Sequence, residues 1–383
     1  MAAVVNATAR FSAPAMRVQA AGKARVAPVA RTAGVASVKS SFTAGRHMSL
    51  AMPVVASRMP RTVTRAEVSV GNVGDRISDE FEQDEMHGEH TRLFLSDVIA
   101  NPRKKLFFNR KYTATDIGYI GFMTVMHGLI FLAPQTFSWA NVGLFFATYV
   151  VTGMLGITLS FHRQLTHKSF ETPKWLEYVF AYCGVLAVQG DPIEWVSSHR
   201  HHHAQCDTPR DPHSPYEGFF WSHMGWLLDE ASTLTRVADR SNANDMAKDK
   251  FYQHIQKHYI WHTVAQFAAL YAFGGLPAIV WGGAMRICWV YHVTWFVNSA
   301  AHVWGGQSWN TGDLSRNNWW VGIIAFGEGW HNNHHAFEYS ARHGLEWWQW
   351  DPTWYTIKVL EFLGLATKIR YPREEHMKRL AFK

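Results

Sequence analysis

Cysteine is scarce in this chain, and its scarcity excludes one class of fold. Only Cys183, Cys206 and Cys288 occur among the 383 residues, in apolar or histidine-rich surroundings. Three such residues do not provide a disulfide framework, which needs paired cysteines and an oxidising compartment. Charged residues are also few, at 17%, whereas aromatic residues reach 14%. So much apolar and aromatic surface requires burial, and disorder throughout the chain is therefore excluded as well.

Acidic residues are absent from the first 66 positions, which contain ten Lys or Arg side chains. A basic, Ser- and Ala-rich leader without a continuous apolar core is typical of an organellar transit peptide and not of a secretory signal. We expect residues 1–66 to be a chloroplast transit peptide, with processing near Glu67. The alternative is a basic arm that binds nucleic acid or anionic lipid. Dense blocks of Lys and Arg are missing, so we expect no nucleic-acid partner.

Long apolar stretches follow a polar segment at residues 67–111. They lie at residues 117–133, 142–161, 259–281 and 284–303. Each approaches the roughly 20 residues that a membrane-spanning helix needs. Residues 175–188 are shorter and carry a charge, which favours an interfacial helix. We predict an all-α integral membrane protein with four transmembrane helices in two hairpins, an interfacial helix, and a helical catalytic cap on one membrane face.

The histidines are gathered in groups near the ends of these stretches. The first group is the pair His162 and His167, whose i, i+5 spacing predicts a loosened helical turn. The other groups repeat an i, i+3, i+4 pattern, which predicts three imidazoles on one helix face, half the shell of a metal site. They are His199, His202, His203 and His331, His334, His335. Two hairpins return the chain to the same side each time, so all three groups face one compartment. Eight imidazoles gathered there suit two metal ions.

Asn298 and His302 add a polar pair near the end of the last apolar stretch. Their i, i+4 spacing predicts a shared helix face, and a polar pair at membrane depth is costly unless it serves a function. Structural zinc is the commonest alternative, but it favours four tetrahedral ligands, often with cysteine. Here no cysteine stands at ligand spacing and no His-Glu-x-x-His motif occurs. The composition of the groups therefore argues against structural zinc.

The histidine groups, in this order and between paired apolar stretches, resemble the membrane-bound acyl desaturases of the delta-9 type. The resemblance runs from about Arg110 to the C-terminal end. It includes the segments Gly156–His167, Glu194–His203, Asp211–His213, Gly218–Trp226, Asn298–His302 and Gly327–Phe337. It implies a desaturase domain at residues 112–383 that holds two iron ions. The implied ligands are His162, His167, His199, His202, His203, His302, His331, His334 and His335, with Asn298 acting through water.

The resemblance also assigns roles around these ligands. It implies that His201 is not a ligand and that His213 and His223 support the site from outside. Neutral imidazoles suit iron, and their second ring nitrogens are normally fixed by carboxylates or carbonyls. Candidates close in the sequence are Asp207, Asp211, Glu194 and Glu328; the alternative for each is a solvated or helix-capping carboxylate. A dry tunnel between the helices is expected for the acyl chain.

The implied activity is a di-iron, O2-dependent desaturation that introduces a cis double bond into a saturated 16- or 18-carbon acyl chain. A hydroxylase or ketolase with the same histidine groups is the nearest alternative, and a non-enzymatic membrane metal-binding protein is a more distant one. The soluble acyl-carrier-protein desaturases use paired Glu-x-x-His motifs. The only Glu-x-x-His in this chain is Glu328–His331, which excludes that family.

The leader and the histidine groups together resemble plastid acyl-lipid desaturases, including those acting on palmitate held in galactolipid. We therefore expect an acyl lipid substrate and a chloroplast membrane location, with the catalytic face toward the stroma. No His-Pro-Gly-Gly haem motif or nucleotide-binding fingerprint occurs. Electrons must then come from an external donor, for which reduced ferredoxin is the expectation.

Overall fold

The computed structural model describes residues 107–108, 110–237 and 239–382. The expected leader at residues 1–66 and most of the segment at residues 67–111 lie outside the described residues. Within the described part, extended pairing is limited to isolated bridges such as Glu171 with Thr367. The rest is built of helices and turns, so the prediction of a helical protein is confirmed.

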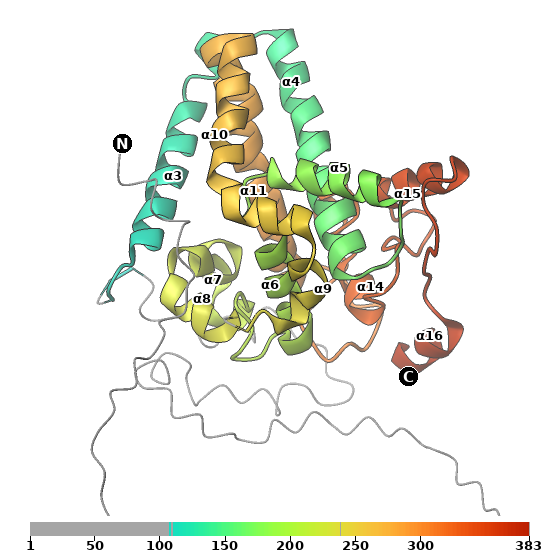
Figure 1. The fold of residues 1–383 in the computed structure, drawn as a ribbon. Coiled ribbons are helices and arrows are strands. Elements are labelled where there is room, and N and C mark those ends of the chain that lie inside the picture. The colour runs from blue at the N-terminus through green and yellow to red at the C-terminus, as the bar shows by residue number, and fades with distance from the viewer. Residues whose placement is uncertain (1–106, 109, 238, 383) are drawn as a thin grey trace, which may run out of the picture. The chain divides into compact units, whose positions relative to one another are not determined.

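The longest helices stand side by side and form one end of the molecule (Figure 1). They are α3 (Ala114–Ile130), α4 (Trp139–Tyr149) with its π-helical continuation η4 (Val150–Thr166), and α10 (Lys250–Ala278), which runs through the π-helical η8 (Ile279–Met285) into α11 (Arg286–Asn298). A capping box starts α3: the Thr113 hydroxyl accepts a hydrogen bond from the Asp116 amide, and the Asp116 carboxylate accepts one from the Thr113 amide.

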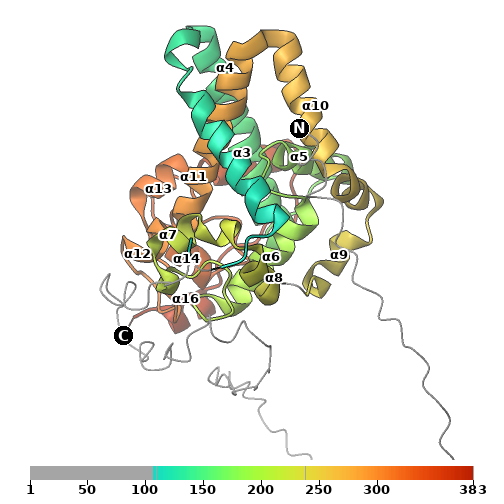
Figure 2. The ribbon, with the colours of Figure 1, turned by 90° about the vertical axis from the view of Figure 1, so that its left-hand side faces the viewer.

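Two helical stretches of the described chain are long and apolar enough to cross a membrane, Trp139–Thr166 and Lys250–Val303. The second, of 54 residues, is interrupted at Gly275, whose φ of 59° and ψ of −152° suit glycine and not other residues. α10 and α11 therefore form two arms of a hairpin, and Figure 2 shows them descending from a common upper turn. The first expected stretch forms the 17-residue α3. Four spans in two hairpins stay a prediction.

The segment expected to be interfacial forms the helix α5 (Lys174–Val185), which lies across the long helices (Figure 1). Its place at a membrane interface stays a prediction. It packs closely on η4, because Gly156 faces the backbone of Cys183 and a Cβ there would stand 2.6 Å from the Cys183 carbonyl oxygen. Leu176 and Phe180 of α5 share an apolar cluster with α15 (Pro352–Phe362). This packing fixes the lower half of η4, which carries the first histidine pair.

A cap of short helices gathers around the lower ends of the long helices (Figures 1 and 2). Its α-helices are α6 (Pro192–Gln205), α7 (Phe219–His223), α8 (Glu230–Val237), α9 (Asn244–Ala247), α12 (Ala300–Val303), α13 (Trp319–Ile324), α14 (His331–Ala336) and α16 (Glu374–Leu380). The 3-10 turns are η3 (Pro134–Thr136), at the upper end of α3, and η5 (Pro215–Glu217), η6 (Gly225–Leu228) and η7 (Ser241–Ala243) in the cap. The second and third histidine groups lie on α6 and α14, so the predicted helical cap carries most of the candidate ligands.

Candidate metal centre and acyl cavity

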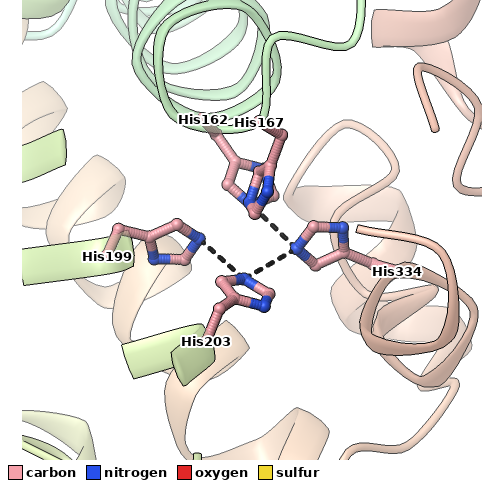
Figure 3. Close-up of side chains that lie close together, drawn as sticks. All are labelled: His162, His167, His199, His203 and His334. Atoms are coloured by element: carbon pink, nitrogen blue, oxygen red, sulfur yellow. Dashed lines mark hydrogen bonds between the residues drawn. The ribbon is translucent and has the colours of Figure 1, made fainter. Parts of the chain in front are cut away.

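The structure brings all nine histidines together in two adjoining clusters. The first cluster consists of His162, His167, His199, His203 and His334, which offer ligand nitrogens within 4.8 Å of one another. The second cluster consists of His202, His302, His331 and His335. Three of these also come within 4.8 Å of one another, together with Cys206, and His331 Nε2 lies 3.0 Å from His302 Nε2. Figure 3 shows the first cluster pointing inward from η4, α6 and α14.

A π-helix brings the two histidines of the first pair, which lie five residues apart, onto the same helix face. In an α-helix, residues five apart would diverge by about 140°. Residues 150–166 instead form a π-helix, and the His167 amide donates to the His162 carbonyl five residues earlier, at 3.2 Å. This wider turn stacks residues i and i+5, and the two rings lie 4.8 Å apart, centroid to centroid. The predicted loosened turn is therefore present, in the form of a π-helix.

The predicted half-shells from the second and third groups are wrong, because each group divides its imidazoles between the two clusters. On a helix, i and i+4 lie about 40° apart, whereas i+3 and i+4 lie about 100° apart. His199 and His203 accordingly enter the first cluster while His202 enters the second. In the third group, His331 and His335 stay together, and His334 crosses to the first cluster. Every ion site would thus be assembled from several segments.

Buried carboxylates lie beside the outer Nδ1 atoms of four of these rings, and the three aspartates among them form hydrogen bonds there. The pairs are His202 with Asp211 at 3.0 Å, His302 with Asp207 at 3.1 Å, His335 with Asp313 at 2.9 Å, and His162 with Glu328 at 2.8 Å. A carboxylate on Nδ1 fixes the tautomer in which Nε2 carries the free lone pair. The arrangement therefore turns Nε2 toward the interior of each cluster.

Three of the four carboxylates expected from the sequence make these contacts, and Glu194 does not. Its carboxylate pairs with Arg240 at 3.2 Å, so its proposed role beside the ligands is wrong. The sequence analysis did not identify Asp313 as a partner of His335, because the two residues lie 22 positions apart and their contact cannot be read from proximity in the chain. His343 was missed as well. It is 1% exposed, and its Nδ1 lies 2.8 Å from Glu328.

The interiors of the clusters fit metal ions. Nε2 of His334 lies 3.0 Å from Nε2 of His203 and 3.1 Å from that of His162. Imidazole nitrogens that share a metal at about 2.1 Å are separated by roughly 3 Å. Nε2 of His335 and Nε2 of His167 are buried without any hydrogen-bond partner. Such orphaned nitrogens are costly unless something binds them, and a metal ion would satisfy them.

The protonation states also suit metal binding. Burial and the neighbouring His162 and His203 hold the pKa of His199 well below its ordinary value. The imidazole is therefore neutral, which is the form that binds a metal. Burial alone would raise the pKa of Asp313, but the adjoining His335 and nearby hydroxyl donors outweigh it and hold that pKa well below its usual range. The carboxylate is therefore ionised.

The helix face predicted for Asn298 and His302 is not continuous. α11 ends at Asn298 and α12 begins at Ala300, with Ser299 between them in the right-handed helical region (φ −104°, ψ −70°). His302 is completely buried in the second cluster, whereas Asn298 lines the adjoining cavity. The helix is interrupted between the two residues, so a face common to Asn298 and His302 stays a prediction.

The three histidines that the resemblance leaves outside the ligand set lie at different distances from the clusters. The His201 Nε2 lies 3.0 Å from the Arg210 carbonyl, outside both clusters. His213 packs on the His202 ring at 4.3 Å between centroids. His223 contacts the Ser299 hydroxyl at 3.0 Å and His292 at 2.9 Å. His201 and His223 lie apart from the groups that could hold a metal ion, whereas His213 forms such a group with His202 and Asp211. A supporting role for the three stays a prediction.

A cavity runs beside the first cluster between the long helices and the cap. Its lining includes apolar groups of the long helices such as Ile157 and Val290, polar groups of the cap such as Glu194, and His162 and Asn298 of the candidate centre. Such a mixed lining allows an extended apolar chain to reach the candidate centre while water is excluded.

Comparison with known proteins places these features in context. Residues 137–361 match the family model described as fatty acid desaturase. The chain is 56% identical over 296 residues to the chloroplastic palmitoyl-monogalactosyldiacylglycerol delta-7 desaturase of Arabidopsis thaliana, covering 77% of this chain and 80% of that protein. It is 51% identical over 296 residues to the acyl-CoA C20 Delta5-desaturase of Anemone leveillei, covering 77% and 95%. It is 47% identical over 294 residues to delta-9 acyl-lipid desaturase 1 of Arabidopsis thaliana, covering 76% and 96%.

Proposed function

Because the chain belongs to the fatty acid desaturase family, and is thus an oxidoreductase that desaturates fatty acyl chains, we propose that its two histidine clusters hold one iron ion each. The proposed reaction introduces a cis double bond into a saturated 16- or 18-carbon chain with O2 as oxidant. The observation that supports it best is the convergence of nine imidazoles into two sets whose Nε2 atoms point inward.

The proposed ligands divide between two ions. His162, His167, His199, His203 and His334 would hold the first iron, and His202, His302, His331 and His335 would hold the second. Iron, when bound, supplies the oxidising power needed to remove hydrogen from an unactivated methylene while O2 is reduced to water. The rest of the reaction depends on positioning by the chain itself.

The chain's own residues contribute order and exclusion of water. Asp207, Asp211, Asp313 and Glu328 hold Nδ1 atoms and so keep the rings in the ligating tautomer. The cavity holds the acyl chain extended beside His162, and its apolar walls keep bulk water from the site. The Asn298 side chain, which lines this cavity, is proposed to hold a water molecule at the second ion.

The substrate carrier and the location are proposed from the leader and the relatives. Two relatives are named chloroplastic, and one of them is named for a galactolipid-bound palmitoyl substrate. We propose a plastid acyl lipid as substrate, and an integral, multi-pass chloroplast membrane protein whose histidine clusters face the stroma. Residues 1–66 would be the transit peptide, residues 67–111 a polar segment and residues 112–383 the desaturase domain. Removal of two hydrogens with full reduction of O2 also consumes two electrons and two protons, and reduced ferredoxin is the proposed electron donor.

Hydroxylation or ketolation is not carried forward as a second candidate. The relatives with high identity are named desaturases of acyl lipids or acyl-CoA. No contact in the described residues favours oxygen transfer over hydrogen removal.

The proposal is tested by three histidine variants on the full chain, expressed in a null strain. His202→Ala and His334→Ala each remove one proposed ligand, one from each cluster. We expect both to abolish the monoene product, measured by gas chromatography of each lipid class, and to lower the iron content of the purified protein. His201→Ala, on the same helix, serves as the matched control and retains product and iron. A zinc-only protein with full activity would contradict the proposal.

A further inference from the structure

The two histidine clusters differ in the charge that surrounds them. In the second cluster, three of the four imidazoles each have an aspartate of their own on Nδ1. The pairs are His202 with Asp211, His302 with Asp207, and His335 with Asp313. The three carboxylates are 0%, 0% and 10% exposed, so little water screens them.

Hydrogen bonds from neutral groups hold these aspartates in place. Asp313 accepts from the hydroxyls of Thr311 and Ser315 at 2.6 and 2.5 Å and from the Ser315 amide at 3.0 Å. Asp211 accepts from the amides of Asp207 and His213 at 2.9 and 3.1 Å. Such donors stabilise the ionised carboxylate without cancelling its charge.

The first cluster has weaker support. Its one buried carboxylate, Glu328, accepts a hydrogen bond from the Arg163 Nε at 2.9 Å and also lies 2.8 Å from the His343 Nδ1. Its negative charge is therefore shared with a permanent cation. Within the described residues, this cluster also has a contact between His203 Nδ1 and Glu338 at 3.5 Å, and the Glu338 side chain is 48% exposed. The Nδ1 atom of His334 is buried without a partner.

These contacts predict unequal metal affinity. A carboxylate on Nδ1 makes the imidazole a stronger donor and adds negative charge close to the ion, and loss of such a partner typically lowers metal affinity about 10–100-fold. Three rings of the second cluster each have a buried aspartate on Nδ1, whereas the one buried carboxylate beside the first cluster, Glu328, is shared with Arg163. We propose that the second cluster holds its iron more tightly than the first, so that the first iron is the exchangeable one. This inference rests on the proposed two-iron function.

The test measures how iron is retained by the purified full-length protein. Holoprotein in detergent is equilibrated against a graded series of a coloured Fe2+ chelator, and the iron left on the protein is measured by elemental analysis. We expect two release steps of one iron each, separated by at least about tenfold in free Fe2+. Mössbauer spectra of the half-depleted protein should then show a single iron environment.

Variants assign each step to a cluster. Asp313→Asn and Asp211→Asn keep the side-chain size and are expected to move the tighter step by about 10–100-fold toward higher free Fe2+, with the weaker step unchanged. Glu328→Gln should move the weaker step alone. Asp116→Asn is the matched control, because Asp116 is equally buried but caps α3 and contacts Arg110. Both steps should be unchanged in this variant.

Several outcomes would overturn the inference. It fails if the wild-type protein releases both irons at one free Fe2+ concentration, or if the aspartate variants move only the weaker step. Asp313→Glu keeps the charge, so a folded Asp313→Glu protein that loses the tight step would show that packing and not charge sets the affinity. A wild-type protein that never contains two irons would refute the proposed two-iron function itself, and the inference with it.

Discussion

Arg163 offers the sharpest test of how the first histidine pair is held. It follows His162 directly and its side chain is completely buried. Its guanidinium donates to Asp351 at 2.8 and 3.0 Å, to Glu328 at 2.9 Å and to the Ala341 carbonyl at 2.8 Å. Replacement by methionine fills a similar volume but leaves two buried carboxylates without their cation.

The cost of this change follows from the contacts. Removing one partner from a buried ion pair typically costs about 3–5 kcal/mol. Asp351 also accepts from the amides of His343 and Trp354 at 2.9 Å each. Its carboxylate therefore remains in place with its charge uncompensated. Each kcal/mol lost from the free energy of unfolding lowers the thermal midpoint by about 2–4 °C in a large domain. Arg163→Met should therefore lower the midpoint by at least about 5 °C.

The assay is thermal unfolding in detergent, followed by circular dichroism, together with the iron content of each preparation. Lys368→Met is the control, because Lys368 and Glu171 form an exposed pair at 2.9 Å with side chains 73% and 57% exposed. An exposed pair contributes no more than about 1 kcal/mol, and its loss should leave the iron content intact. If Arg163→Met shifted the midpoint no more than Lys368→Met does, the argument from buried charge would be refuted.

Three further predictions concern the reaction and the leader. Asn298→Leu should keep both irons but lose most turnover, and Asn298→Asp should lose less turnover; iron content and product formation measure the two effects. Wild-type turnover in Asn298→Leu would show that Asn298 only packs. A Cβ at Gly153 would lie 3.2 Å from the Tyr149 ring in the cavity lining. Gly153→Leu should therefore narrow the cavity and shift the products toward shorter acyl chains, as measured by gas chromatography. An unchanged product profile would contradict this. A reporter fused to residues 1–66 should enter plastids, and the mature protein should begin near Glu67; an intact N-terminus on the isolated protein would contradict the transit peptide.

The sequence by itself determined which residue types gather and on what kind of element. The length of the apolar stretches predicted helices that the structure contains, among them α5 at the segment expected to be interfacial. The i, i+3, i+4 spacing is a local property of a helix, so it could be read before the fold was known. The count of eight imidazoles without cysteine also indicated two ions, and the structure divides them between two clusters.

Only the tertiary structure decided how these groups combine. The i, i+4 spacing keeps two imidazoles of each group together, but the cluster that each imidazole enters depends on where η4, α6 and α14 meet. Asp313 and His343 reach the site through loops that fold back over α14, so their distance along the chain hid them. The interruption between α11 and α12 at Ser299, which local spacing did not predict, separates Asn298 from His302. Local periodicity ends where a helix ends, and a metal centre assembled from several segments is fixed by their packing.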